Sequence, residues 1–293
     1  MNRRRFIQAL GGLSAAAALP FHLEARAQTQ SARDASSPGG FKLGLVTYNL
    51  GKDMDVCALI KSCSQTGFEG VELRTTHAHK VEVNLSAAER QEVKARFEDS
   101  PVRLVSLGST FDYHTPDPEK LKRDIEETRE YIRLARDVGA EAIKVRPNDL
   151  PSGVPPEKTL EQIGKSFRQV ALYGAELGID IRMEVHGNQT CLLPNIKKII
   201  DIADHPNATV CWNSNMDDLK GEGWDYNYNL VKDKITVCHI TELWNADYPW
   251  RKLFSSLKRD GFKGYTLAEI PHNPDPVRIM RYYRALWLAL QEG

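Results

Sequence analysis

The chain has 293 residues, of which 41% are apolar and 27% charged, with 39 basic side chains against 39 acidic ones. This composition is that of a globular protein and excludes disordered and fibrous classes, while the balanced charge argues against a nucleic-acid binder, which needs a positive surplus. The longest apolar run, residues 7–21, is interrupted by Gly, Ser and Pro, so we expect no membrane span.

The first 27 residues resemble a twin-arginine export signal. Arginines at positions 3–5 precede Phe6, a weakly apolar block follows, and the run Ala-Arg-Ala at 25–27 suits a signal peptidase. We therefore expect cleavage after Ala27 and a periplasmic protein exported by the twin-arginine pathway; a basic amphipathic helix is the alternative. Residues 28–40 are polar and rich in Ser and Gly, which predicts a disordered linker.

From residue 41 onward, short β-rich runs alternate with amphipathic stretches of helical period. Strands are expected at 42–49, 70–74, 102–108, 142–147, 180–186, 209–213, 235–240 and 265–269. Helices are expected at 53–66, 87–99, 117–138, 156–177, 193–203, 223–231, 250–260 and 275–291. This regular α/β alternation predicts one domain, 41–293, folded as a single parallel (β/α)8 TIM barrel. No GxGxxG or P-loop motif follows a strand, which disfavours a nucleotide-binding open sheet.

The cysteine content points to neither disulfides nor zinc. The five cysteines are Cys57, Cys63, Cys191, Cys211 and Cys238. Their number is odd, most lie in or beside apolar runs, and no CxxC pair occurs. We expect unpaired thiols, most of them buried.

Polar residues close the last four predicted strands, at the barrel face where TIM-barrel chemistry is found. They are Glu184, Asn213, His239 and Glu269. Each alone is more often an ion-paired or hydrogen-bonded core residue, but their coincidence at four neighbouring strand ends favours a site for a divalent cation, Mn²⁺ or Mg²⁺. Strand alternation also places Glu184 and His186 on one face, which we expect to be the barrel interior.

Segments 72–82, 210–215, 238–243 and 248–270 resemble exported proteins of the xylose isomerase-like barrel superfamily that are labelled sugar phosphate isomerase/epimerase. The resemblance extends from residue 41 to the C-terminus. It implies a metal-assisted carbohydrate isomerase or epimerase that abstracts a proton next to a carbonyl and forms an enediolate. The superfamily's metal ligands, Glu, Asp, His and Glu on strands five to eight, fall on the four residues named above. Asn213 in the Asp position removes one negative charge, which is expected to weaken metal binding.

The resemblance also implies roles for other residues. Glu184 and Glu269 are expected to exchange the substrate's protons, and Lys144 to stabilise the enediolate; for Lys144, an ion pair with Glu72 or Glu184 is an equal alternative. From their places at or just after strand ends, substrate contacts are expected of Glu72, His77, His79, Arg146, His186, Trp212, Asn215 and Glu242. For His77 and His79, a second ion or a solvated pair on a loop is the alternative.

Several functions remain open at this point. The same site could serve a 3-keto-glycoside lyase or hydratase, or the chain could be a non-catalytic carbohydrate-binding barrel. An endonuclease-like phosphodiesterase is disfavoured, because the strand ends offer few His and Asp and residues 28–293 hold 35 basic against 38 acidic side chains. Without a Gly-rich cradle or evident arginine clamp, free sugars, glycosides or oxidised sugars are favoured over sugar phosphates. The resemblance allows a homo-oligomer of unspecified order.

Overall fold

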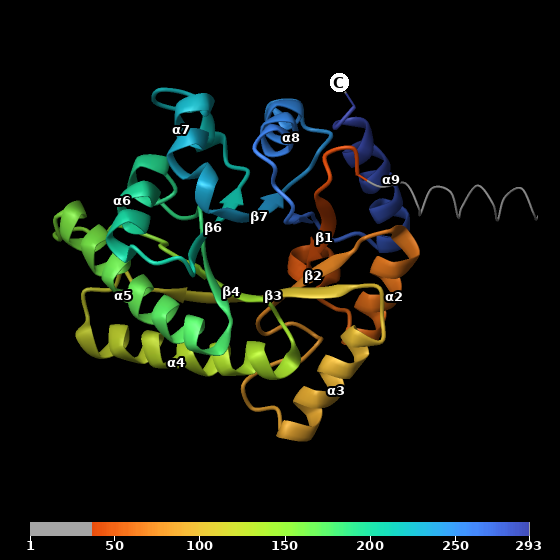
Figure 1. Cartoon of the computed structure of the whole chain (residues 1–293), viewed down its shortest axis with the longest axis horizontal. Coiled ribbons are helices and arrows are strands. Elements are labelled where there is room, and N and C mark those ends of the chain that lie inside the picture. The colour runs from red at the N-terminus through yellow and green to blue at the C-terminus, as the bar shows by residue number, and fades with distance from the viewer. Residues whose placement is uncertain (1–36, 293) are drawn as a thin grey trace, which may run out of the picture. The chain divides into compact units, whose positions relative to one another are not determined.

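The computed structural model describes residues 37–292, which fold as a closed barrel of eight parallel strands in the order β1 to β8, with β8 beside β1 (Figure 1). The strands are β1 Lys42–Val46, β2 Gly70–Arg74, β3 Arg103–Asp112, β4 Ala142–Arg146, β5 Asp180–Glu184, β6 Ala208–Asn213, β7 Ile235–Ile240 and β8 Tyr265–Ala268. The α-helices are α2 Val56–Thr66, α3 Ala87–Glu98, α4 Pro118–Val138, α5 Pro156–Leu177, α6 Leu193–Ala203, α7 Trp224–Val231, α8 Trp250–Arg259 and α9 Pro276–Ala289. The predicted TIM barrel is confirmed.

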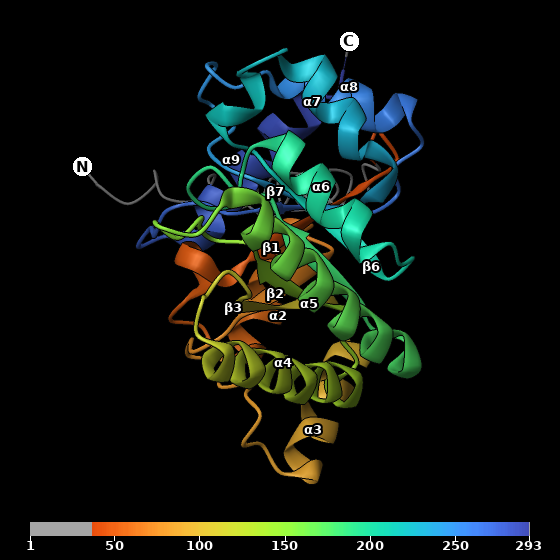
Figure 2. The same ribbon diagram turned by 90° about the vertical axis from the view of Figure 1, so that its left-hand side faces the viewer.

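The helices surround the sheet, and Figure 2 shows α4, α5 and α6 lying side by side along one flank. Local signals set their ends. Asp117 caps α4 by accepting hydrogen bonds from two backbone N–H groups of the first turn, and Ser86 forms a capping box with Glu89 at α3. Gly139 ends α4 in the left-handed conformation, with φ of 79°, which turns the chain into β4.

Two strand ends differ by three residues or more from the sequence-based expectation. The first strand ends at Val46, and Thr47–Gly51 forms a helical turn in which Thr47 Oγ1 accepts a hydrogen bond from the Arg74 N–H at 2.9 Å. A side chain thus takes the place of a strand carbonyl. The third strand continues to Asp112, because its pairing with β4 resumes after a register shift between Gly108 and Asp112.

The apolar core has two parts separated by the sheet. The outer part lies between strands and helices, and the inner part fills the barrel with Val46, Val105, Cys211, Val237, Tyr265 and Leu267. Packing inside is tight, since a Cβ at Gly70 would lie 2.5 Å from Val105 and 2.6 Å from Tyr265. The charged side chains described below therefore lie beyond this inner apolar core, toward the carboxyl ends of the strands.

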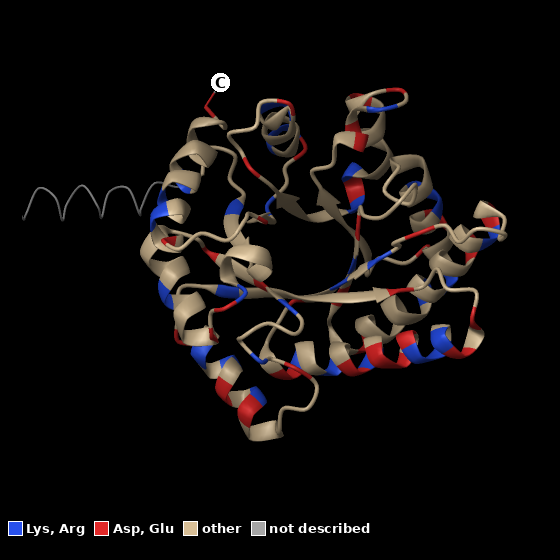
Figure 3. Ribbon diagram, turned by 180° about the vertical axis from the view of Figure 1, so that it is seen from behind, with Lys and Arg blue, Asp and Glu red and all other residues tan. Residues whose placement is uncertain are grey.

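The surface of the helices mixes charges of both signs (Figure 3). On α4, for example, Lys120 pairs with Asp124 one turn away. None of the described helices is long and apolar enough to cross a membrane. All five cysteines are unpaired, and all except Cys57 are buried.

The expected signal peptide, 1–27, lies outside the described residues. The expected linker, 28–40, overlaps them only at 37–40. These four residues form a turn in which the Gly39 N–H donates to Gln291 Oε1 at 3.0 Å.

Candidate functional site

Three potential metal ligands meet at the carboxyl end of the barrel. Glu184 ends β5, His239 lies near the end of β7, and Glu269 directly follows β8. His239 Nδ1 lies 3.2 Å from Glu184 Oε1 and 3.3 Å from Glu269 Oε2, and one ligand atom from each residue lies within 4.8 Å of the others. Glu184 and His239 are buried, whereas 23% of the Glu269 side chain is exposed. Solvent therefore reaches this cluster, the candidate metal site, from the Glu269 side.

The fourth predicted ligand, Asn213, lies on the same interior face. Cys211 belongs to the inner core and Trp212 to the outer one, so alternation turns Asn213 inward, and the register pairs it with His239 on β7. Two carboxylates, an imidazole nitrogen and a neighbouring amide oxygen are a donor set that suits a divalent cation. The residues present therefore fit the metal that the sequence predicts.

The far side of the His239 ring is supported by Glu72. Glu72 Oε1 lies 3.4 Å from His239 Nε2, and its other oxygen accepts a hydrogen bond from Ser106 Oγ at 2.6 Å. Burial raises the pKa of Glu72, but His239, Lys144 and Ser106 outweigh it and lower the pKa to about 2. Because Glu72 is completely buried, the structure does not support the expected substrate contact. It orients the imidazole instead.

Lys144 adds a second buried charge pair. Its Nζ lies 2.6 Å from Glu184 Oε2, and both side chains are almost inaccessible. Burial opposes the charged forms, but the attraction between the two groups prevails, raising the pKa of Lys144 and lowering that of Glu184 well below its usual range. Of the two partners that the sequence allowed, Lys144 therefore pairs directly with Glu184, and Glu184 stays ionised.

The acidic groups around His239 favour the protonated form of its imidazole. Burial lowers the pKa of this imidazole, but Cys211, Glu72 and Glu184 outweigh burial and raise it well above its usual value. A cation bound between Nδ1 and the two glutamates would take the place of that proton, because a ligating imidazole must be neutral.

His77 and His79 follow β2 at the rim but differ in availability. His77 is half-buried, hydrogen-bonded through Nδ1 to Thr47 Oγ1 at 2.9 Å and stacked on Tyr48. Burial, together with the charges of His79 and Arg74, lowers the pKa of His77 to about 4, so it is neutral near pH 7. His79 is buried, donates from Nε2 to the Arg74 carbonyl and accepts the Val81 N–H at Nδ1. With both nitrogens engaged, His79 shapes the loop rather than binding a substrate.

Arg146 and His186 occupy the mouth above the cluster. Arg146 ends β4 two residues after Lys144, and His186 lies two residues after Glu184, so both face inward. Burial lowers the pKa of His186, with Glu184, Arg146, Lys144 and Glu269 acting on the same ring. This shared electrostatic environment places both residues where a substrate would meet the cluster.

Two predicted substrate contacts instead stabilise the loop that follows β6. Trp212 is fully buried in the outer core and donates from Nε1 to Tyr248 Oη at 3.0 Å. Asn215 donates from Nδ2 to the Val185 carbonyl at 2.6 Å, and its N–H donates to Asp218 Oδ2 at 3.1 Å. The expectation for Trp212 is corrected, because strand alternation turns its indole toward α7, away from the barrel interior.

Glu242 lies in the loop after β7. It is half-buried, and the indole N–H of Trp244 donates to its carboxylate. The Trp244 side chain is 73% exposed. Glu242 therefore holds an exposed indole on the loop that follows the His239 strand.

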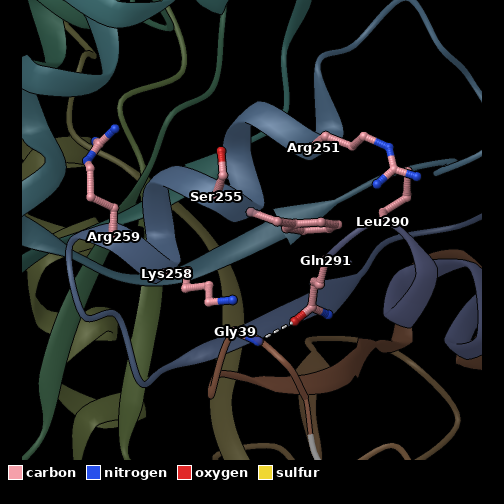
Figure 4. Close-up of a pocket in the computed structure, with 8 residues that line it drawn as sticks. Gly39, Arg251, Ser255, Lys258, Arg259, Leu290 and Gln291 are labelled. Atoms are coloured by element: carbon pink, nitrogen blue, oxygen red, sulfur yellow. Dashed lines mark hydrogen bonds between the residues drawn. The ribbon is translucent and has the colours of Figure 1, made fainter. Parts of the chain in front are cut away.

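A pocket of about 330 Å³ lies elsewhere, between α8 and the end of α9 (Figure 4). Its lining residues are Gly39, Arg251, Phe254, Ser255, Lys258, Arg259, Leu290 and Gln291. None of these belongs to a strand, and no carboxylate or imidazole lines the pocket. The pocket is therefore separate from the candidate metal site, whose residues lie at the ends of strands.

Sequence reasoning missed three contributors to the site. Ser106 hydrogen-bonds Glu72, and Gly108 leaves room for it, since a Cβ there would lie 2.6 Å from Glu72 Oε1. Neither residue carries a chemical signal in the sequence. Arg74 did carry one: it stands two residues after Glu72 and therefore faces the same interior.

Comparison with known proteins places the barrel in context. The sequence model of a family described as xylose isomerase-like TIM barrel matches residues 60–286. No curated protein matches the chain.

Solved structures share the fold at low sequence identity. A 3-keto-D-glucoside 4-epimerase from E. coli, in apo form, is 16% identical, with a TM-score of 0.71 over 85% of this chain and 99% of that one. D-psicose 3-epimerase from Clostridium cellulolyticum H10, solved with D-tagatose, is 14% identical, with a TM-score of 0.71 over 84% and 99%. The IOLI protein, solved with a zinc atom, is 13% identical, with a TM-score of 0.69 over 85% and 96%. At these identities the likeness establishes the architecture.

Proposed function

Because the chain belongs to the xylose isomerase-like TIM barrel family, we propose that it is a metal-assisted carbohydrate isomerase or epimerase. The observation that carries the proposal is the meeting of Glu184, His239 and Glu269 at the carboxyl end of the barrel. Structural neighbours named as sugar epimerases support the substrate class. We assign Mn²⁺ or Mg²⁺ to the two glutamates, His239 and Asn213.

A divalent cation bound at these residues would supply Lewis-acid polarisation of the substrate's carbonyl. The chain's own groups move the proton. Glu269, which solvent can reach, removes a proton from the carbon beside the carbonyl, and the C–H electron pair passes into an enediolate. The Lys144 ammonium, 2.6 Å from Glu184, supplies fixed positive charge close to the charge that develops on the substrate.

The return of the proton decides the product. If Glu184 receives a proton from the Lys144 ammonium, 2.6 Å away, and delivers it to the opposite face of the same carbon, the centre is inverted. Lys144 then regains a proton from solvent, and Glu269 releases its own. If Glu269 returns its proton to the former carbonyl carbon, and the proton of the adjacent hydroxyl passes to the former carbonyl oxygen, an aldose and a ketose interconvert. Loss of a substituent on the next carbon gives elimination instead. A solved structure named as a probable 3-DHS dehydratase, 14% identical with a TM-score of 0.63, supports this lyase outcome as the second candidate.

Proton exchange with solvent tests the function directly. Protein loaded with Mn²⁺ or Mg²⁺ is incubated in D₂O with ketoses and 3-keto-glucosides, and carbon-bound deuterium and products are read by mass spectrometry. We expect exchange in the wild type, loss of at least about a hundredfold in Glu269→Gln and Glu184→Gln, and no loss in Glu157→Gln, an exposed glutamate on α5. Absence of exchange with every substrate in the metal-loaded wild type would refute the proposal.

We also propose export to the periplasm, on the strength of the N-terminal sequence. The mature protein should then begin at Gln28 in the periplasmic fraction. Replacing Arg3 and Arg4 together by lysine should retain the precursor in the cytoplasm. N-terminal sequencing of both fractions decides the matter, and an unprocessed wild-type chain would contradict it.

A further inference from the structure

Two arginines share the mouth of the barrel above the candidate metal site. Arg74 ends β2, two residues after Glu72, and Arg146 ends β4, two residues after Lys144. Because side chains two residues apart on a strand point to the same face, each arginine faces the barrel interior, one position closer to solvent than Glu72 or Lys144. Both side chains are half-buried at this level.

Neither guanidinium has an anionic partner within the described chain. Arg74 Nη1 donates to the carbonyl and hydroxyl oxygens of Thr75, at 3.2 and 2.9 Å, and Arg146 Nη2 donates to the Thr110 carbonyl at 3.4 Å. Arg146 Nε is buried without a hydrogen-bond partner. N–H donors of both guanidinium groups therefore remain without an acceptor in the described part of the chain, and in a half-buried place an unpaired donor costs free energy.

The carboxylate best placed to neutralise Arg146 is held by other groups. Asp112 pairs with Arg146 in the β3–β4 register. One of its oxygens lies 2.9 Å from His114 Nδ1, and the other accepts from Asn148 Nδ2 at 3.3 Å. Asp112 thus faces a neighbouring histidine and asparagine, and Arg146 remains without an ion pair.

The two arginines act on each other. Burial lowers the pKa of Arg74, the positive charge of Arg146 lowers it further, and Glu184 and Glu72 oppose the shift. The same mouth contains His186, whose Nδ1 is also buried without a partner. Two like charges and an unpartnered imidazole nitrogen thus border one space.

The charges that border the mouth of the barrel show that a negative charge is missing there once a cation is bound. Glu72, Glu184 and Glu269 are three negative charges, against the positive charges of Lys144, Arg74 and Arg146. These six groups cancel, and a divalent cation at the candidate site displaces the proton of His239, so two positive charges would remain uncompensated. A neutral sugar cannot supply the missing negative charge.

We propose that the substrate of this site is a carbohydrate bearing an anionic group, a carboxylate or a phosphate, bound by Arg74 and Arg146. The proposal rests on the proposed function, because the cation supplies the excess charge. Planar guanidinium groups suit both anions through paired N–H donors. The arginine clamp that the sequence did not reveal is formed by two strands that are not neighbours in the sheet.

The test compares acidic and neutral sugars by titration calorimetry on protein with measured Mn²⁺ content. The probes are D-glucuronate for the carboxylate, D-glucose 6-phosphate for the phosphate and D-glucose as the neutral reference. We expect at least one acid to bind about tenfold or more tighter than glucose, with a preference that shrinks at about 0.5 M salt. Which acid prevails distinguishes the two anions.

Variants locate the effect. Arg146→Gln and Arg74→Gln should each reduce the preference for the acid severalfold, and lysine at the same positions should retain part of that preference. The control is Arg281→Gln, at an exposed position on α9, which should leave the preference unchanged. Equal binding of glucose and both acids, or a preference that survives in both glutamine variants, would overturn the inference. Deuterium exchange with neutral sugars but no acid preference would refute the inference alone; an acid preference without any exchange would refute the proposed function alone.

Discussion

At the scale of single residues, burial decides how strongly an ion pair matters. Lys144–Glu184 and Lys165–Glu161 both have an N–O distance of 2.6 Å. The first pair is 6% and 4% exposed and the second 66% and 53%. The inner pair keeps Glu184 ionised in the candidate site, whereas water screens the outer one.

Removing the lysine from each pair should show this difference. Lys144→Met leaves a buried carboxylate without its partner, so the free energy of unfolding should fall by about 3 kcal/mol. Lys165→Met, the control at equal distance, should cost less than about 1 kcal/mol. Urea denaturation at pH 7 measures both, and equal losses would contradict the argument.

Asp218 gives a second prediction at this scale. Its Oδ2 accepts hydrogen bonds from Tyr248 Oη and the Asn215 N–H, while its buried Oδ1 has no partner. Burial is the main cause that raises the pKa of Asp218, with Asp217 adding to it, to about 8. Between pH 3.8 and about 8 the unfolded chain therefore loses a proton that the folded chain keeps, and stability falls as the pH rises.

Asp218→Asn should remove this pH dependence. We expect the variant to gain about 1–3 kcal/mol relative to the wild type at about pH 8 and much less at about pH 5. Asp201→Asn, at an exposed carboxylate paired with Lys197, is the control. Unfolding curves at the two pH values give the answer; a gain of the same size at both would show that the charge on Asp218 is not the cause.

At the scale of elements, local sequence signals set the ends of helices, and pairing with a neighbouring strand sets the ends of strands. Helices begin and end where caps satisfy their terminal N–H and carbonyl groups, as Ser86 and Gly139 do. Strand ends depend on the neighbouring strand: β3 runs on to Asp112 because β4 pairs with it again beyond the register shift. This is why all helix limits except the start of α2 lie within two residues of the expectation, whereas two strand ends do not.

The cap of α3 can be tested by itself. Ser86→Ala removes the oxygen that accepts the Glu89 N–H, so stability should fall by about 1 kcal/mol. Glu89→Gln keeps a capping-box residue and should cost less than about 0.5 kcal/mol. Thermal unfolding measures both variants, and deuterium exchange with substrate should be unchanged. A larger loss for Glu89→Gln than for Ser86→Ala would contradict the capping argument.

At the scale of the whole molecule, closure of the barrel brings together groups that are distant along the chain. His239 Nε2 and Glu72 Oε1 are 3.4 Å apart, although β7 and β2 are not neighbours in the sheet. Glu184 on β5 and Glu269 directly after β8 are likewise brought together across the interior. Such contacts across the interior exist only in the folded state, so a cation that needs them should bind the folded chain and not the unfolded one.

Metal binding should therefore stabilise the protein as a whole. With Mn²⁺ at about a hundred times its dissociation constant, linkage supplies about 2.7 kcal/mol, which should raise the melting temperature by about 5 °C, and a chelator should reverse the rise. Glu184→Gln and Glu269→Gln should lose this response, whereas Glu157→Gln should keep it. Scanning calorimetry with elemental analysis measures it; an unchanged melting temperature in the wild type would count against the metal site.

The extent of sequence-based prediction differs between fold and site. The eight strands and eight helices follow from hydrophobic period and turn residues, which act over short distances along the chain. The convergence of Glu184, His239 and Glu269 was predicted from their places at strand ends. The roles of Glu72 and Trp212 were not, because each depends on what lies across the barrel or behind the sheet.

The amino-acid sequence alone determined the order of the elements, the barrel they form and the strand ends that hold ionisable groups, since alternation and capping are local properties. Only the tertiary structure decided that Glu72 supports His239 and that Lys144 pairs with Glu184. It also decided that Arg74 and Arg146 share the mouth without a carboxylate partner among residues 37–292. The reason is physical: register and closure fix which side chains meet across the interior, and desolvation there sets the energy of every charge.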